Sequence, residues 1–149
     1  ASMHKLVPNS AWLVMLRDPR DVALSCYFQR FGSTSLGVAC LTLEGALEAV
    51  CHVMRYWLAV RARLGAGQYL ELRYEELVAD VDGVVASICG RLGWGSGEGG
   101  EREFLNLTPS YEAIERPVYD GAVRRWERSG VEWDMEGFGD LLVEFGYGA

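Results

Sequence analysis

Leu-Arg-Asp-Pro-Arg-Asp-Val-Ala-Leu-Ser-Cys-Tyr, residues 16–27, joins an apolar segment to a helical one and decides how the chain folds. The preceding residues, Trp12–Leu16, are typical of a buried strand. Asp18 can accept hydrogen bonds from the first free amides of a helix, and Pro19 suits the first helical position. Asp21 stands three residues after the cap, as in a capping box. The stretch therefore predicts a strand followed at once by a helix.

Two side chains of this stretch are candidates for binding an anion. Arg17 stands at the carboxyl end of the predicted strand, and Ser25 lies two turns along the helix. In open α/β sheets ligands bind in the crevice at the strand ends. A guanidinium and a hydroxyl beside a helix N-terminus can hold a phosphate. The residues alone leave an alternative open, in which Arg17 pairs with Asp18 or Asp21 and Ser25 is merely tolerated in the helix.

The rest of the chain alternates between helical and strand patterns. We expect a first helix over residues 20–31, a Gly-rich loop over 32–37, a long helix over 42–64, a strand over 69–74 and a helix over 80–92, with short helices at 102–107, 120–127 and 135–145. This order predicts an α/β fold with a parallel sheet flanked by helices. Two strands alone make a poor sheet of this kind, so we expect a fold that is incomplete at the N-terminus.

Composition narrows the class of protein. The 149 residues suit a single domain, and a net charge of −7 argues against a general binder of nucleic acid or anionic membrane. No apolar run reaches about 18 residues, and the N-terminus lacks a signal-peptide pattern. The four cysteines have no paired spacing, which predicts reduced thiols in a cytoplasmic protein and no metal site. They are Cys26, Cys40, Cys51 and Cys89.

Two blocks of the chain are similar to sulfotransferases, the enzymes that use 3′-phosphoadenosine-5′-phosphosulfate (PAPS). The first is the segment 16–27, because this family places an arginine at a strand end and a serine eight residues later, as at Arg17 and Ser25. The resemblance implies that both bind the 3′-phosphate of PAPS. The second block is Leu-Arg-Tyr-Glu-Glu-Leu-Val-Ala-Asp, residues 72–80. It implies that Tyr74 lies beside the adenine.

A third block resembles the loop that folds over the nucleotide in bacterial repeat-containing sulfotransferases and in protein-tyrosine sulfotransferases. Arg-Pro-Val-Tyr at 116–119 is followed by Arg-Arg-Trp at 124–126. Ser110 and Arg125 match the two positions of that loop that contact the ligand, and Arg116 adds positive charge. The alternative is that the arginines near position 125 form a solvated helix face. Gln29 departs from the protein-tyrosine enzymes, which tend to have an arginine there, and this speaks against a protein acceptor.

Two parts of the family's machinery have no counterpart in the sequence. The 5′-phosphosulfate loop would need glycine followed by basic and hydroxyl residues after a strand, and the Gly-rich segment 93–100 holds Glu98, lacks Lys and Arg, and follows a helix. No residue is a good candidate for the catalytic base. His4 is too close to the first strand, His52 lies within a helix, and a helix-start role explains Glu75 and Glu76. The catalytic residues are therefore unknown.

The resemblance implies that residues 1–149 are the C-terminal portion of one sulfotransferase domain with a P-loop-nucleotide-transferase-like fold. The expected activity is sulfuryl transfer from PAPS, without a metal, to a hydroxyl or amine on a small molecule, glycan or peptide. This chain would bind the 3′-phosphate and adenine, while a missing N-terminal half or a partner chain would supply the rest. Two alternatives stay open. One is a non-catalytic binding or scaffold domain, and the other is a P-loop-type transferase that uses ATP.

Overall fold

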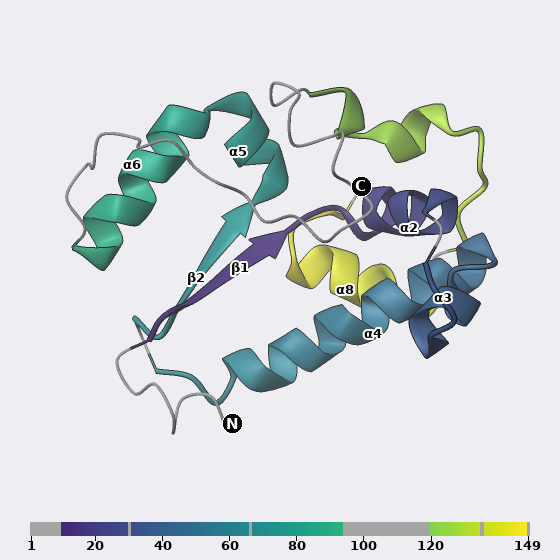
Figure 1. Cartoon of the computed structure of the whole chain (residues 1–149), viewed down its shortest axis with the longest axis horizontal. Helices are drawn as coiled ribbons and strands as arrows, with labels where there is room; N and C mark the ends of the chain where they lie inside the picture. Colours follow the sequence, from purple (N-terminus) through teal and green to yellow (C-terminus); the bar gives the residue numbers. More distant parts are fainter. Residues whose placement is uncertain (1–9, 30, 66, 94–119, 135, 149) are drawn as a thin grey trace.

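A computed structural model describes residues 10–29, 31–65, 67–93, 120–134 and 136–148. The two strands and the three longest helices follow the order that the sequence pattern predicts for a mixed α/β chain, and two short helices, α3 and α5, lie outside the ranges predicted for helices (Figure 1). These elements are β1 (Trp12–Leu16), α2 (Pro19–Phe28), α3 (Ser35–Ala39), α4 (Leu43–Arg61), β2 (Tyr69–Arg73), α5 (Tyr74–Ala79), α6 (Val81–Leu92), the 3-10 turns η1 (Asp120–Ala122) and η2 (Arg125–Arg128), and α8 (Gly139–Glu144).

The two strands β1 and β2 pair in parallel, with Trp12 opposite Tyr69 and Leu16 opposite Arg73. Parallel pairing confirms the predicted crossover through the intervening helices. In Figure 1 the strands run between α4 on one side and α5 with α6 on the other. The prediction that β1 is buried was wrong, because Leu13 is 54% exposed and Met15 is 46% exposed. Their face of β1 is open in the described part of the chain.

The start of α2 follows the predicted capping only in part. The Asp18 carboxylate accepts a hydrogen bond from the Arg20 amide at 2.9 Å, which confirms the cap. The predicted capping box was wrong, since the Asp18 amide donates to Glu75 Oε1 at 3.1 Å and the Asp21 carboxylate bonds elsewhere. The helix also ends earlier than predicted, at Phe28, because Gln29 is extended.

Capping residues set the bounds of several other helices, some of which match the predicted bounds and some of which do not. Thr42 caps α4 and Asp80 caps α6, each at the first residue of the range predicted for that helix, and Gly93 ends α6 in the left-handed conformation at φ 68°. Helix α3 was missed because it lies across the predicted loop, where Thr34 caps it. Residues 120–127 form 3-10 turns and no α-helix, and the last predicted helix is shortened to α8. The helix predicted at 102–107 lies outside the described residues.

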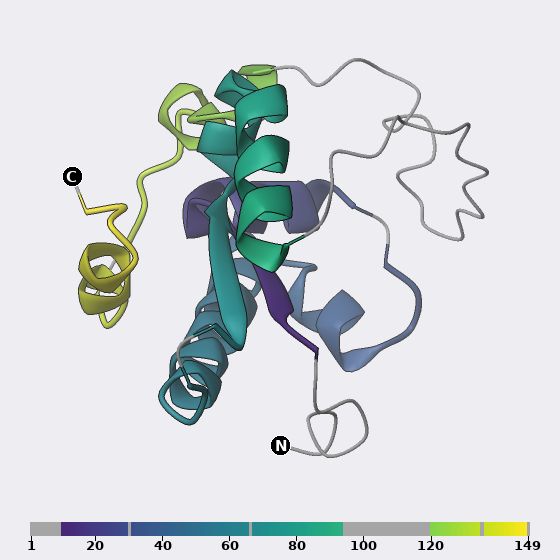
Figure 2. The ribbon, with the colours of Figure 1, turned by 90° about the vertical axis from the view of Figure 1, so that its left-hand side faces the viewer.

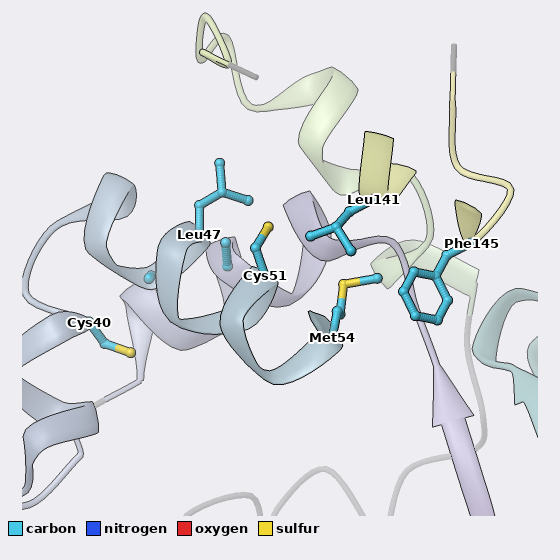
Figure 3. Close-up of a cluster of buried hydrophobic side chains, with 8 residues drawn as sticks. Cys40, Leu47, Cys51, Met54, Leu141 and Phe145 are labelled. Carbon is cyan, nitrogen blue, oxygen red and sulfur yellow. The ribbon is translucent and has the colours of Figure 1, made fainter. Parts of the chain in front are cut away.

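The hydrophobic core lies where α4 packs against α2 and α8 (Figure 3). Figure 2 shows α8 beside α4 from a second direction. The core side chains are small or flexible apart from Phe145, which is 2% exposed. The cysteines are free thiols, and burial raises the pKa of both Cys26 and Cys51. The buried core residues are Ala23, Cys40, Ala46, Leu47, Cys51, Met54, Leu141 and Phe145.

Two further features concern the described residues only. None of their helices is long and apolar enough to cross a membrane. Within the same ranges, no three side chains of His, Cys, Asp or Glu come together as ligands for a metal ion.

Candidate functional site

The register of the two strands brings together Arg17 and Tyr74. Leu16 is paired with Arg73, so the next residue of each strand emerges at the same end of the sheet. There the Arg17 guanidinium lies over the Tyr74 ring, with Cζ 4.5 Å from the ring centroid. This is the carboxyl end of both strands, where α/β sheets bind ligands. Two residues predicted from separate segments therefore form one corner.

Arg17 lies in the corner without a carboxylate partner. Its Nη2 donates to the backbone oxygen of Ala122 at 2.7 Å, and its buried Nε has no hydrogen-bond partner. Within the described residues it forms no ion pair, because Asp18 is paired with Arg20 at 2.7 Å. The alternative of an ion pair between Arg17 and Asp18 or Asp21 is therefore not seen. The guanidinium lies near enough to Asp21 to oppose the rise in that group's pKa caused by burial, and its unpartnered Nε remains a donor that an anion could accept.

The other predicted site residues do not join this corner in the described part of the chain. Ser25 is half-buried on α2, and no hydrogen bond connects its hydroxyl to Arg17 or Tyr74 there. Arg125 is exposed in η2, with its guanidinium 5.3 Å from the Phe28 ring centroid. It lines a cavity of about 570 Å³ on the flank of α2 together with Phe28. Ser110 and Arg116 lie outside the described residues.

Glu75 ties the corner to the C-terminal segment. Its Oε1 accepts from the Asp18 amide, and its Oε2 accepts from the Tyr147 hydroxyl at 3.1 Å. Burial, followed by the nearby Glu75 charge, raises the pKa of Tyr147, so its hydroxyl stays protonated and can donate. The Arg73 guanidinium lies over the Tyr147 ring, with Cζ 4.8 Å from the ring centroid. The predicted helix-start position of Glu75 in α5 is confirmed, and the structure gives this carboxylate a second role as a bridge.

Sequence reasoning missed the contacts of Asp21 and Trp126. The Asp21 side chain is 1% exposed, and its Oδ1 accepts from the Trp126 amide at 2.8 Å. Burial raises the pKa of this carboxyl group. The Trp126 indole lies under the Arg20 guanidinium, with 3.5 Å from Cζ to the ring centroid. Trp126 belongs to the third block of the resemblance, but no local pattern points to Asp21 as its partner.

Arginines gather at this end of the sheet although the chain carries a net charge of −7. Two of them lie in or next to the strand ends, and others come from η2 and the residue before it. Asp18, Asp21, Glu75 and Glu127 are also present; Asp18 pairs with Arg20, and Glu127 Oε1 lies 3.9 Å from Arg124 Nε. An acidic protein can bind an anionic ligand if positive side chains surround the binding site, even though the net charge of the protein is negative. The arginines are Arg17, Arg20, Arg73, Arg124, Arg125 and Arg128.

Comparison with known families supports the resemblance. The family model described as the sulfotransferase family matches residues 1–96. The matched region includes Arg17, Ser25 and Tyr74, and it ends before Ser110 and Arg125. A comparison with curated proteins gave no significant match. Since the family match spans more than half of the 149 residues, the chain belongs to the sulfotransferase family.

Proposed function

We propose that this chain binds PAPS for the transfer of a sulfuryl group to a hydroxyl or amine acceptor. In this proposal Arg17 binds the 3′-phosphate and Tyr74 lies beside the adenine. The observation that carries it is the Arg17 guanidinium, which is stacked on Tyr74 and has no ion-pair partner among the described residues. Ser25 adds a hydroxyl from α2, the helix that follows Arg17. Ser110, Arg116 and Arg125 are proposed as further contacts from the segment that follows the family match.

The surroundings of Arg17 fit a phosphate. The stack on Tyr74 and the bond to Ala122 hold the guanidinium in one orientation, so little side-chain entropy remains to be lost on binding. The first turn of α2 begins beside it, and the positive end of a helix dipole favours anions. A guanidinium also offers two parallel donors that match phosphate oxygens. Arginine at this position therefore supports recognition of a phosphate over recognition of a neutral group.

In the proposed reaction Arg17 and Tyr74 bind the donor and take no part in the bond changes at sulfur. The acceptor oxygen or nitrogen forms a bond to sulfur while the bond from sulfur to the bridging oxygen of the phosphosulfate breaks. The acceptor proton goes to a base, and 3′-phosphoadenosine-5′-phosphate (PAP) leaves. Arg17 and Tyr74 would hold the part of the donor that does not react, and such binding orients the reacting end. No residue of this chain is assigned as the base.

Calorimetric titration with PAP tests the proposal. The Arg17→Ala variant should bind PAP about ten- to a hundredfold more weakly, because a charge-assisted contact is worth roughly 1.5–3 kcal/mol. A smaller loss is expected for Ser25→Ala. Arg91→Ala is the matched control, since this exposed arginine lies in the last turn of α6. Equal affinities in wild type and Arg17→Ala would refute the assignment, and ATP binding as tight as PAP binding would favour another nucleotide-dependent transferase.

A further inference from the structure

The residues 120–128, which we call the strap, lie across the start of α2 in the same corner. The strap comprises η1 and η2, and both lie at the end of the sheet toward which the strand arrows point (Figure 1). Arg17 donates to Ala122 O, Arg20 covers the Trp126 ring, and Asp21 accepts from the Trp126 amide. Each of these contacts spans more than one hundred positions of sequence. The motif at 16–27 is therefore also the docking surface of the strap.

Asp21 is more deeply buried than Arg20, and its Oδ2 has no hydrogen-bond partner among the described residues. Asp21 is 1% exposed, and within the described residues its carboxylate forms no ion pair. Asp18 already caps the helix, so Asp21 is not needed for that role. A buried carboxylate is costly unless it accepts hydrogen bonds, and the Trp126 amide supplies one at 2.8 Å. The position of this carboxylate is therefore explained by the strap.

Hydrogen bonds within the strap connect its residues, so the contact of the Trp126 amide with Asp21 also restricts the position of its neighbours. Arg128 Nη2 donates to the backbone oxygens of Gly121 at 2.9 Å and Val123 at 3.2 Å, which closes the segment on itself. Arg124 has the left-handed conformation at φ 51°, and η2 begins directly after it. Such a residue is uncommon outside glycine and persists where its surroundings hold it. Because Arg125 immediately precedes Trp126, docking of the Trp126 amide also sets the place of Arg125 beside α2.

We propose that Asp21 is a positioning residue that docks the strap onto α2 and thereby holds Arg125 in place for the nucleotide. The part concerning Arg125 rests on the proposed function, whereas docking of the strap does not. Asp21 touches no reacting group in this proposal, and it acts through the Trp126 amide. The acceptor oxygen is the essential feature, so Asp21→Asn should retain docking and Asp21→Ala should lose it.

Limited trypsin digestion with mass spectrometry measures docking directly. Cleavage after Arg124, Arg125 and Arg128 needs local opening of the strap, because a protease binds an extended backbone. In Asp21→Ala these cleavages should become roughly ten- to a hundredfold faster, the factor expected when a buried amide loses its acceptor. Asp21→Asn should stay within about threefold of wild type. Asp82→Ala, which removes an exposed acid from the first turn of α6, should leave the rates unchanged.

Three outcomes would overturn docking by Asp21. They are unchanged strap cleavage in Asp21→Ala, an Asn variant that resembles the Ala variant, and faster cleavage at Arg55 and Arg91 to the same extent as in the strap. If Asp21→Ala does not fold, hydrogen exchange in the wild-type protein tests instead whether the Trp126 amide is held by Asp21. The Trp126 amide should then exchange at least about tenfold more slowly than an unprotected amide, and unprotected exchange would refute the proposal.

PAP titration of the same variants tests the link to the nucleotide. Asp21→Ala should weaken PAP binding about fivefold or more, and Asp21→Asn should restore it. Faster strap cleavage with unchanged PAP affinity would refute the positioning role for Arg125. A wild-type protein that binds no PAP would refute the proposed function, while the trypsin result would still decide whether Asp21 docks the strap.

Discussion

Helices α2 and α6 begin with the same local chemistry and lie in opposite surroundings. Asp18 caps the first and Asp80 caps the second, and each helix has another aspartate in its first turn. In α2 the first three residues, Pro19, Arg20 and Asp21, are all buried. In α6 no residue is buried, and the side chain of its cap accepts only from Gly83 in its own first turn among the hydrogen bonds described.

Both helices start with the same kind of local cap, so capping alone does not explain why the start of α2 is buried. The difference lies in its contacts with distant parts of the chain. The start of α2 contacts Glu75 on α5, Tyr147 near the chain end and the strap. At the start of α6, the Asp80 amide donates to the Glu76 backbone oxygen of the adjacent helix α5 at 2.9 Å, and no hydrogen bond described connects it with Tyr147 or the strap. Burial raises the cost of each charged group in α2, and every such group is held by a specific partner. This order is expected where a ligand must be held in one place.

The largest contrast is expected between the two caps. Asp18→Ala removes the cap and also the carboxylate that binds Arg20 through Nε at 2.9 Å and Nη2 at 2.7 Å. Both side chains are about nine-tenths buried, so the guanidinium would remain uncompensated, at a cost of about 3–5 kcal/mol in unfolding free energy. Asp80→Ala should cost only about 1 kcal/mol, the usual value of an exposed cap.

Urea denaturation of both variants measures this contrast. Similar losses in Asp18→Ala and Asp80→Ala would contradict the view that α2 differs from α6 through its long-range contacts. Restoring the cap alone with Asp18→Ser should recover only about 1 kcal/mol of the loss, because the serine hydroxyl cannot replace the ion pair.

An intermediate effect is expected from the aromatic partner of α2. Trp126→Ala keeps the backbone amide bound to Asp21 and removes the indole under Arg20, which should cost about 1–3 kcal/mol. Trp126→Phe should recover part of this loss. In α6, Val85 is 46% exposed, and Val85→Ala should change stability by at most about 0.5 kcal/mol. Thermal unfolding that ranks these variants in another order would argue against stacking as a source of stability.

The smallest effect is the dependence of stability on pH. Burial raises the pKa of Asp21 above its ordinary value of 3.8, so the folded protein holds this proton to higher pH than the unfolded chain. Between these two pKa values the folded state binds more protons, and its stability falls as pH rises. The unfolding free energy of wild type relative to Asp21→Asn should therefore decrease across that window.

The matched comparison is made at the corresponding acid of α6. Asp82 is exposed, and the difference between wild type and Asp82→Asn should change little with pH. Denaturation curves recorded from about pH 3 to 7 give both differences. A rise with pH for the Asp21 pair would mean that the folded protein stabilises the charged carboxylate, contrary to the burial of this group.

Local signals predicted the parts of the fold that depend on neighbours in sequence. Asp18 caps α2 as predicted, the predicted helix starts at 42 and 80 coincide with the caps Thr42 and Asp80, and α6 ends at the predicted residue 92. Residues 120–127 were expected to be a helix, but Gly121 weakens that pattern and left-handed Arg124 interrupts it. The short helix α3 was hidden because its sequence, with two glycines and several hydroxyl residues nearby, is typical of a loop.

The candidate site was predictable only where strand order fixes it. Parallel pairing of β1 with β2 implies that Arg17 and Tyr74 emerge together, and the structure places them so. The contacts of Arg17 with Ala122 and of Asp21 with Trp126 each span 105 positions. No periodicity or spacing predicts such contacts, because they depend on how the strap packs against α2 in three dimensions.

The central claim is that the Arg17 corner recognises a 3′-phosphate. The most direct test compares PAP with adenosine-5′-phosphate, which lacks only that phosphate, by calorimetric titration of wild type and Arg17→Ala. Wild type should bind PAP about ten- to a hundredfold more tightly, and this preference should largely disappear in Arg17→Ala. A wild-type protein that binds both nucleotides equally, or a preference that survives in Arg17→Ala, would contradict the account.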